Sequence, residues 1–181
     1  MLKPCSSRWF YFSQFLIVVG LLAFAYYLER YQGLLPCALC EMQRLSFTLL
    51  GALFLLSILL PFKKGPQVLM NLLVSVVALF GILFAGRQVW LQYVPVTFDS
   101  GTCEASLQYM MQIMPWSQVL MSVFLGGPEC AKVSNTFFYM SIADWSLLWF
   151  IIFFLLALGQ GLAWLFSRRE IAQALHKYKI R

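Results

Sequence analysis

The fold is decided by long uncharged stretches, of which the longest is Trp145–Phe166, WSLLWFIIFFLLALGQGLAWLF. A helix needs roughly 20 apolar residues to cross about 30 Å of hydrocarbon. Three further stretches come close to that length, namely Trp9–Leu28, Leu45–Leu60 and Val68–Ala85. Because lipid-exposed backbone must satisfy its own hydrogen bonds, all four are expected to be helices. We predict an all-α membrane protein, a four-helix bundle forming one domain over residues 1–181, with spans at about 9–28, 45–60, 68–85 and 145–166.

The composition of the whole chain supports a membrane protein. Of the 181 residues, 61% are hydrophobic and 11% are charged, whereas a soluble domain has about 45–50% and about 25%. Disorder is excluded, because a disordered chain has low hydrophobicity and high net charge. The 11 glycines and 5 cysteines also exclude a collagen-like chain and a small disulfide-knot domain.

The basic residues predict how the spans are oriented. Of the 13 Lys and Arg residues, nine lie near the chain ends or in the turn 61–67, and four lie in the segments 29–44 and 87–144. By the positive-inside rule, both termini and the turn face the cytoplasm, and the two longer segments face outward. The net charge of +6 is then a topology signal, and no basic stripe with interleaved aromatic residues indicates nucleic-acid binding.

The first span has an alternative interpretation as a cleavable signal peptide. Lys3 and Arg8 precede the apolar run, and Ala23-Phe24-Ala25 is similar to a cleavage site. The apolar run continues beyond that site to Leu28. A retained first helix is therefore the preferred interpretation.

Four of the five cysteines fall in the two outer segments. Cys37 and Cys40 lie in the first, Cys103 and Cys130 lie in the second, and Cys5 lies in the cytoplasmic tail. Disulfides persist on the outer side of the membrane if the host is a bacterium with a periplasm. The even number outside predicts disulfide chemistry there, whereas Cys5 is interpreted as a plain surface thiol.

The first pair belongs to the stretch LPCALCEMQR, residues 35–44. Pro36 suits the first turn of a helix, so Cys37 is expected near the positive end of the helix dipole, which lowers a thiol pKa. Cys40 and Arg44 follow at i+3 and i+7, on the same helix face. We predict a redox-active Cys-x-x-Cys motif whose arginine stabilises a Cys40 thiolate or an anionic oxygen of a bound cofactor.

Other interpretations of this motif compete. Zinc would need a second pair at similar spacing or histidine ligands, but the other two outer cysteines are 27 residues apart and the only histidine, His176, lies in the opposite compartment. Arg44 taken alone fits a lipid-headgroup anchor. A structural Cys37–Cys40 disulfide closes so small a ring that it would stabilise the fold little, which favours redox use.

The second pair permits a structural role more readily. A Cys103–Cys130 bridge would close about 27 residues and contribute roughly 3–4 kcal/mol. The Gly, Pro and Ser residues before each cysteine instead indicate exposed loops, where the thiol of a partner can reach a sulfur. Between the two cysteines, the Met-rich run Leu107–Phe124 predicts a short interfacial helix on the outer leaflet. A packed loop over the bundle and a protein-docking surface are its alternatives.

The order Leu-Pro-Cys-x-Leu-Cys-x-x-x-Arg, followed by a cysteine pair in a long second outer segment, resembles the disulfide bond formation protein B (DsbB) family over essentially the whole chain. The resemblance implies an enzyme of the bacterial inner membrane with periplasmic cysteines. This thiol:quinone oxidoreductase would reoxidise a DsbA-like periplasmic thiol oxidase and pass the electrons to ubiquinone or menaquinone.

The resemblance also implies roles for individual residues. Cys103 would form the mixed disulfide with the partner, Cys103 and Cys130 would oxidise it, and Cys37 and Cys40 would pass electrons to the quinone. Cys40 would face the quinone, with Arg44 and Arg87 as cofactor-binding residues. Some members carry a histidine shortly after the second arginine, but residues 89–95 contain none.

Two further functions are weighed against this one. The first is a four-span membrane scaffold with purely structural periplasmic disulfides. The second is a redox-regulated transporter, but no span carries the acidic or paired polar residues expected of an ion path.

Overall fold

The structure is a computed structural model that describes residues 7–32, 37–60, 64–94, 110–112, 115–126, 128–131, 136–137 and 140–179. Its long helices are α1 (Ser7–Gln32), α2 (Ala38–Leu59), α3 (Lys64–Tyr93) and α7 (Ile142–Lys179). The shorter elements between α3 and α7 are α5 (Trp116–Leu125), α6 (Pro128–Ala131), β1 (Thr136–Phe137) and β2 (Met140–Ser141). The two short strands pair antiparallel.

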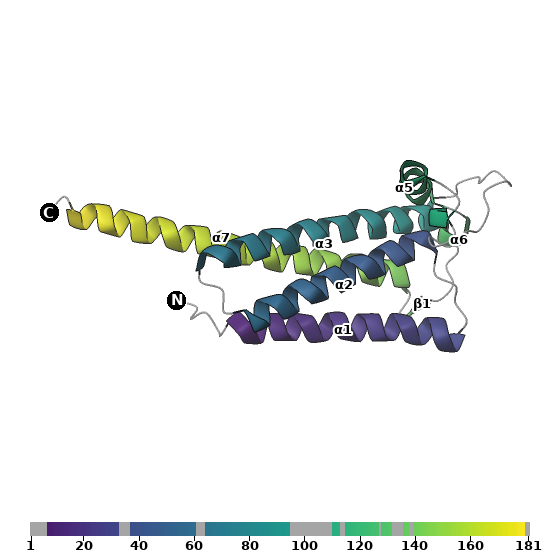
Figure 1. Ribbon diagram of the computed structural model, residues 1–181, viewed down its shortest axis with the longest axis horizontal. Coiled ribbons are helices and arrows are strands. Elements are labelled where there is room, and N and C mark those ends of the chain that lie inside the picture. Colours follow the sequence, from purple (N-terminus) through teal and green to yellow (C-terminus); the bar gives the residue numbers. More distant parts are fainter. Residues whose placement is uncertain are drawn as a thin grey trace.

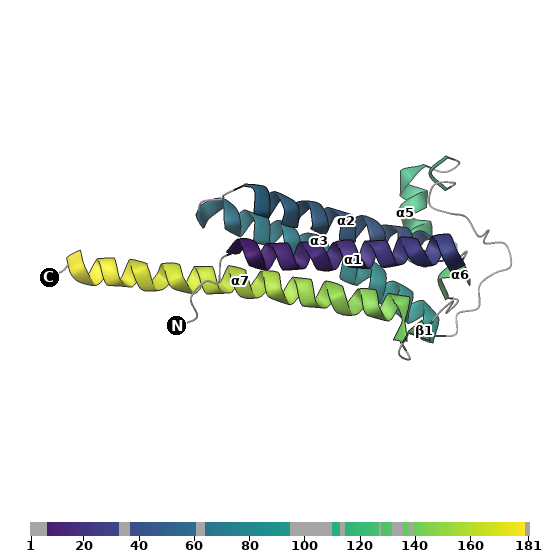
Figure 2. The ribbon, with the colours of Figure 1, turned by 90° about the horizontal axis from the view of Figure 1, so that it is seen from below.

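The long helices lie alongside one another and the short elements gather at one end of the bundle (Figure 1). Helix α5 runs across the bundle, since it is seen end-on in Figure 1 and lengthwise in Figure 2. The C-terminal part of α7 extends beyond the other helices at the opposite end (Figure 2). The beginning of α1 also lies toward that opposite end.

Within the described residues, four helices are long and apolar enough to cross a membrane. Their candidate spans are Arg8–Tyr31, Ala38–Leu59, Gln67–Tyr93 and Ile142–Leu162. The predicted all-α four-helix bundle is therefore confirmed. Helix α2 begins earlier than the predicted span at 45, and α3 continues past 85. Both extensions carry buried glutamines, Gln43 and Gln88, which bond to each other across the two helices.

Side chains that face outward from the bundle are largely apolar. Leu59, Leu72 and Leu155 are examples, each more than half exposed. A soluble protein rarely shows so large a contiguous apolar surface, whereas a hydrocarbon environment requires it. The exposed apolar side chains and the lengths of the helices therefore both indicate membrane-spanning helices.

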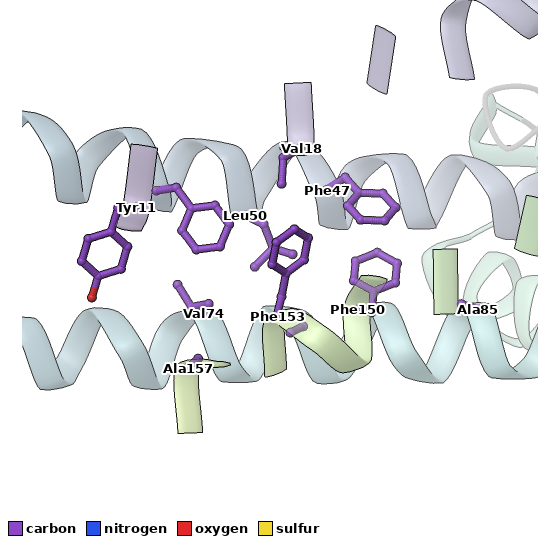
Figure 3. Close-up of a cluster of buried hydrophobic side chains, with 11 residues drawn as sticks. Tyr11, Val18, Phe47, Leu50, Val74, Ala85, Phe150, Phe153 and Ala157 are labelled. Atoms are coloured by element: carbon purple, nitrogen blue, oxygen red, sulfur yellow. The ribbon is translucent and has the colours of Figure 1, made fainter. Parts of the chain in front are cut away.

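The core of the bundle is aromatic and closely packed (Figure 3). The rings of Phe47 on α2 and Phe150 on α7 stack with centroids 4.0 Å apart. A Cβ atom at Gly81 of α3 would lie 2.3 Å from the Phe150 ring. The missing side chain of Gly81 therefore lets α3 and α7 approach each other, as small residues commonly do between membrane helices.

A buried polar contact joins three helices on the side of the core away from the short elements. The Tyr11 hydroxyl of α1 lies 2.8 Å from Asn71 Oδ1 of α3 and 3.0 Å from Gln160 Oε1 of α7, and it can donate to either oxygen. Hydrogen bonds between membrane helices stabilise them by about 0.6–2 kcal/mol. This contact therefore helps to fix which helices are neighbours.

Candidate redox site

The structure brings three of the four predicted cysteines together at the end of the bundle that carries the short elements. Cys37 is the N-cap of α2, with φ −76° and ψ 164°, and Cys40 lies in the first turn of this helix. The Cys37 thiol donates to Cys40 Sγ over 3.1 Å. Cys130 of α6 is 3% exposed and hydrogen-bonds to Cys37. Cys103 and Cys5 lie outside the described residues.

Helix α6 reaches this position by packing against α2 and α3. Cys130 belongs to a small apolar cluster with Leu39 of α2, Leu91 of α3 and Val119 and Val123 of α5. This cluster is separate from the aromatic core and lies where the short elements cover the bundle (Figure 1). Apolar packing thus holds the third sulfur beside the Cys-x-x-Cys pair.

Gly126 makes the turn between α5 and α6. Its φ of 74° and ψ of 154° fall in a region that is essentially restricted to glycine. A Cβ atom there would also lie 2.3 Å from Leu91 Cδ1. The turn that precedes Cys130 therefore depends on this glycine.

A Gly126→Ala variant is expected to displace Cys130 without dissolving the bundle. The backbone strain costs on the order of 1–3 kcal/mol, and the close approach to Leu91 adds to it. Formation of a Cys37–Cys130 disulfide under a mild oxidant, measured with Cys40 and Cys103 changed to serine, should slow several-fold. Gly20→Ala is the control, because nothing lies within 4 Å of its added Cβ. Equal cross-linking rates in the two variants would contradict this role of Gly126.

Two buried glutamines, which sequence reasoning missed, contact the cysteine pair. Gln88 Nε2 of α3 lies 3.2 Å from Cys40 Sγ and 3.7 Å from Cys37 Sγ. Gln43 Nε2 of α2 donates to Gln88 Oε1 over 2.6 Å. Polar side chains inside an apolar helix are costly and tend to be functional. That principle is the sequence signal that could have found Gln88.

The sequence predicted that the start of the helix lowers the pKa of the Cys37 thiol, and this prediction is wrong for the reduced pair. The hydrogen bond of Cys37 with Cys130, its hydrogen bond with Cys40 and its burial raise the pKa of the thiol well above the usual range. The thiol form is favoured because its single S–H can donate to a neighbouring sulfur, and burial disfavours the charged form. These local effects outweigh the partial positive charge at the start of α2.

Arg44 directs its guanidinium toward α1. It forms an ion pair with Glu29, lies 5.3 Å from the centre of the Tyr26 ring, and donates to the Ala25 carbonyl over 3.4 Å. The sequence spacing places Arg44 one turn beyond Cys40, but the hydrogen bonds of Cys40 go to Cys37 and Gln88. A cofactor-binding role for Arg44 stays a prediction.

Arg87 contacts the crossing helix. Its Nε donates to the Phe124 carbonyl at the end of α5 over 2.8 Å. This bond satisfies a carbonyl that has no partner within its own helix. Arg87 thereby ties α5 to α3, and its predicted role in binding a cofactor stays a prediction.

The predicted short helix in the second outer segment is present as α5. It begins after Pro115, and its buried face carries Val119 and Val123. Trp116 in the first turn and Met121 on the opposite side of the helix are both largely exposed. Contact of this surface with the outer leaflet stays a prediction. Among the described residues, no group of three His, Cys, Asp or Glu side chains could hold a metal ion.

The fold and the site define a class of small four-helix membrane proteins in which a Cys-x-x-Cys pair meets a cysteine from a distant segment. The family model described as disulfide bond formation protein DsbB matches residues 7–160. The chain belongs to the DsbB family, and its role therefore lies in disulfide bond formation.

Individual relatives agree with this assignment. The disulfide bond formation protein B of Marinobacter nauticus is 38% identical over 157 residues, which cover 84% of this chain and 90% of the relative. Disulfide bond formation protein B 1 of Pseudomonas aeruginosa is 40% identical, covering 82% and 90%. The protein from Azoarcus is 38% identical and covers 93% and 97%. No solved structure matches the chain.

Proposed function

We propose that the protein is a thiol:quinone oxidoreductase that reoxidises a DsbA-like periplasmic dithiol protein and delivers the electrons to a membrane quinone. The observation that carries the proposal is the hydrogen bond between Cys130 and Cys37. It puts the sulfur of one cysteine pair in contact with the other pair, although 93 residues separate the two in sequence. Family membership supports the same function.

The exchange begins at the second pair. A thiolate of the partner attacks Cys103 of a Cys103–Cys130 disulfide, forms a mixed disulfide with it and releases Cys130 as a thiolate. The Cys130 thiolate then attacks Cys37 Sγ of a Cys37–Cys40 disulfide. A Cys37–Cys130 bond forms, the Cys37–Cys40 bond breaks, and the electron pair leaves on Cys40. The contact between Cys37 and Cys130 supports this step.

Two further exchanges complete the transfer. The second thiol of the partner attacks the partner sulfur that is bonded to Cys103. The partner leaves with its disulfide formed, and Cys103 is released as a thiolate. That thiolate attacks Cys130, re-forms the Cys103–Cys130 bond and releases Cys37. Two electrons have then moved from the partner to a Cys37–Cys40 dithiol, and no bond is left unaccounted for.

The residues around Cys40 fit a quinone. Cys40 is half-buried, and Arg44 lies one helical turn further along α2, with its guanidinium near the exposed ring of Tyr26. An arginine N–H can donate to a carbonyl oxygen, and the tyrosine ring offers apolar contact to a planar group. When bound, a ubiquinone or menaquinone supplies an acceptor for two electrons and two protons. The Cys37–Cys40 dithiol is the donor, and its oxidation restores the starting disulfide.

This function requires the orientation predicted from the basic residues. The cysteines would lie on the periplasmic side of a bacterial inner membrane, and both termini would lie in the cytoplasm. The exposed apolar surface of the four long helices supports a multi-pass membrane location. Thiol exchange then takes place at the bundle end that carries the short elements.

The test uses purified protein, a reduced DsbA-like protein and ubiquinone in detergent. Oxidation of the partner should proceed through many turnovers only when the quinone is added, and quinone loss should match partner oxidation one to one. In the scaffold alternative, neither pair would cycle. If thiol trapping finds that the oxidation state of Cys37 and Cys40 does not change during the reaction, the proposal is wrong.

A further inference from the structure

The amide of Gln88 sits at the reacting sulfurs in a fixed orientation. Gln88 is 6% exposed and Gln43 is 4% exposed, so neither amide has water as its main partner. Gln43 Nε2 donates to Gln88 Oε1. Gln88 Oε1 also lies 3.5 Å from Cys40 Sγ and accepts from the Cys40 thiol, but Gln88 Nε2 is nearer, at 3.2 Å. A Cys40 thiolate has no proton to donate, so only the N–H group of Gln88 can bond to it, while Oε1 keeps its bond from Gln43. The pair of glutamines therefore presents a donor, rather than a carbonyl oxygen, as the nearest amide atom to Cys40.

The N–H donor of Gln88 lies closer to the sulfur of Cys40 than to the sulfur of Cys37. Gln88 Nε2 is 3.2 Å from Cys40 Sγ and 3.7 Å from Cys37 Sγ. A hydrogen bond to an ionised acceptor is about twice as strong as one between neutral groups. Negative charge on Cys40 Sγ is therefore stabilised more than the same charge on Cys37 Sγ. Arg44, the basic residue nearest to Cys40 in sequence, instead contacts Glu29 and the Ala25 carbonyl of α1.

This inequality has a consequence for disulfide exchange. When a thiolate attacks a disulfide, one sulfur forms the new bond and the other leaves with the electron pair. A sulfur that is better stabilised as a thiolate is the faster leaving group. Attack at Cys37 with departure of Cys40 is thus favoured over the reverse, and Cys37 is also the sulfur that Cys130 contacts.

We propose that Gln88 is a catalytic residue whose N–H group stabilises Cys40 as the leaving thiolate, and that Gln43 is a positioning residue that keeps this N–H group directed at the sulfur. The inference rests on the proposed function, because it specifies the direction in which the Cys37–Cys40 disulfide opens. In this proposal, two neutral amides rather than a charged side chain determine which sulfur of the Cys37–Cys40 disulfide leaves as the thiolate.

The direction of opening can be measured without the quinone or the protein partner. The oxidised full-length protein in quinone-free detergent is mixed with reduced glutathione and quenched early with an alkylating reagent. Glutathione bonds to one cysteine of the pair, and the released cysteine is alkylated. Peptide mass spectrometry then gives the ratio of glutathione on Cys37 to glutathione on Cys40.

The wild-type protein should carry glutathione mainly on Cys37. In Gln88→Met, which keeps the length of the side chain but has no N–H donor, the ratio should fall about three- to tenfold. Gln88→Glu, which has the same shape but no amide N–H, should lower the ratio at least as much. Gln43→Met should lower it less and add nothing to Gln88→Met, because Gln43 acts only through Gln88.

The matched control is Gln92→Met, one turn further along α3. The Gln92 side-chain oxygen is buried without a hydrogen-bond partner, so this variant removes a glutamine from the same helix without removing a bond to the cysteines. Its ratio should equal that of the wild type. An unchanged ratio in both Gln88 variants, or an equal fall in Gln92→Met, would overturn the assignment.

The outcome is separable from that of the proposed function. If quinone-dependent turnover is observed but the Gln88 variants leave the glutathione ratio unchanged, only the role of Gln88 fails. If the ratio shifts as expected but no turnover with quinone occurs, the direction of opening stands and the electron acceptor is wrong.

Discussion

A Cys130→Ser variant is expected to lose quinone-dependent oxidation of the dithiol partner by at least about a hundredfold. Serine cannot form a disulfide, so electrons entering at Cys103 have no route to the first pair. In the structure, Cys130 is the cysteine outside the first pair that hydrogen-bonds to Cys37. The rate of partner oxidation in detergent, with quinone in excess, measures the effect.

A small dithiol provides the control for this variant. Dithiothreitol needs no docking surface, and it can attack the Cys37–Cys40 disulfide directly. Quinone reduction by dithiothreitol should therefore stay within about twofold of the wild-type rate in Cys130→Ser, whereas Cys40→Ser should abolish it. A Cys130→Ser protein that still oxidises the partner at a near-normal rate would show that the two pairs do not communicate through Cys130.

The sequence was sufficient for the four helices because hydrophobic length is a local property. Each predicted span lies in one long helix, and the motif around Cys37 and Cys40 lies at the start of α2, as the position of Pro36 indicated. The ends of the helices were less predictable. Gln43 and Gln88 look like headgroup-layer or loop residues when taken alone, but they are buried because each is the partner of the other.

The arrangement of the site could not be derived from the sequence. The contact between Cys130 and Cys37 depends on α6 packing against α2 and α3, and on the conformation of Gly126, both of which are tertiary features. The thiol pKa of Cys37 was predicted in the wrong direction for the same reason. A helix end acts within its own turn, whereas the neighbouring sulfur of Cys130 comes from a segment far along the chain.

The Arg44→Met variant is expected to raise the apparent KM for quinone by about tenfold to a hundredfold. A hydrogen bond to a group that carries charge contributes roughly 1.5–3 kcal/mol, which corresponds to that range. Methionine keeps most of the length of the side chain while removing every N–H donor. The KM is measured with dithiothreitol as the electron donor, so that docking of the protein partner does not enter the measurement.

The ion pair between Arg44 and Glu29 makes a matched control available. Glu29→Gln removes the charge of the acid but leaves the guanidinium and all of its donors in place. If Arg44 binds the quinone, Glu29→Gln should keep the KM within about threefold of the wild type, because a partly exposed ion pair contributes only about 0–1 kcal/mol. If Arg44 serves only as an anchor for α1 and the headgroups, the two variants should instead show the same small change in KM and the same loss of thermal stability. The ratio of the KM values of the two variants thus shows whether Arg44 is a quinone ligand or only a structural cation.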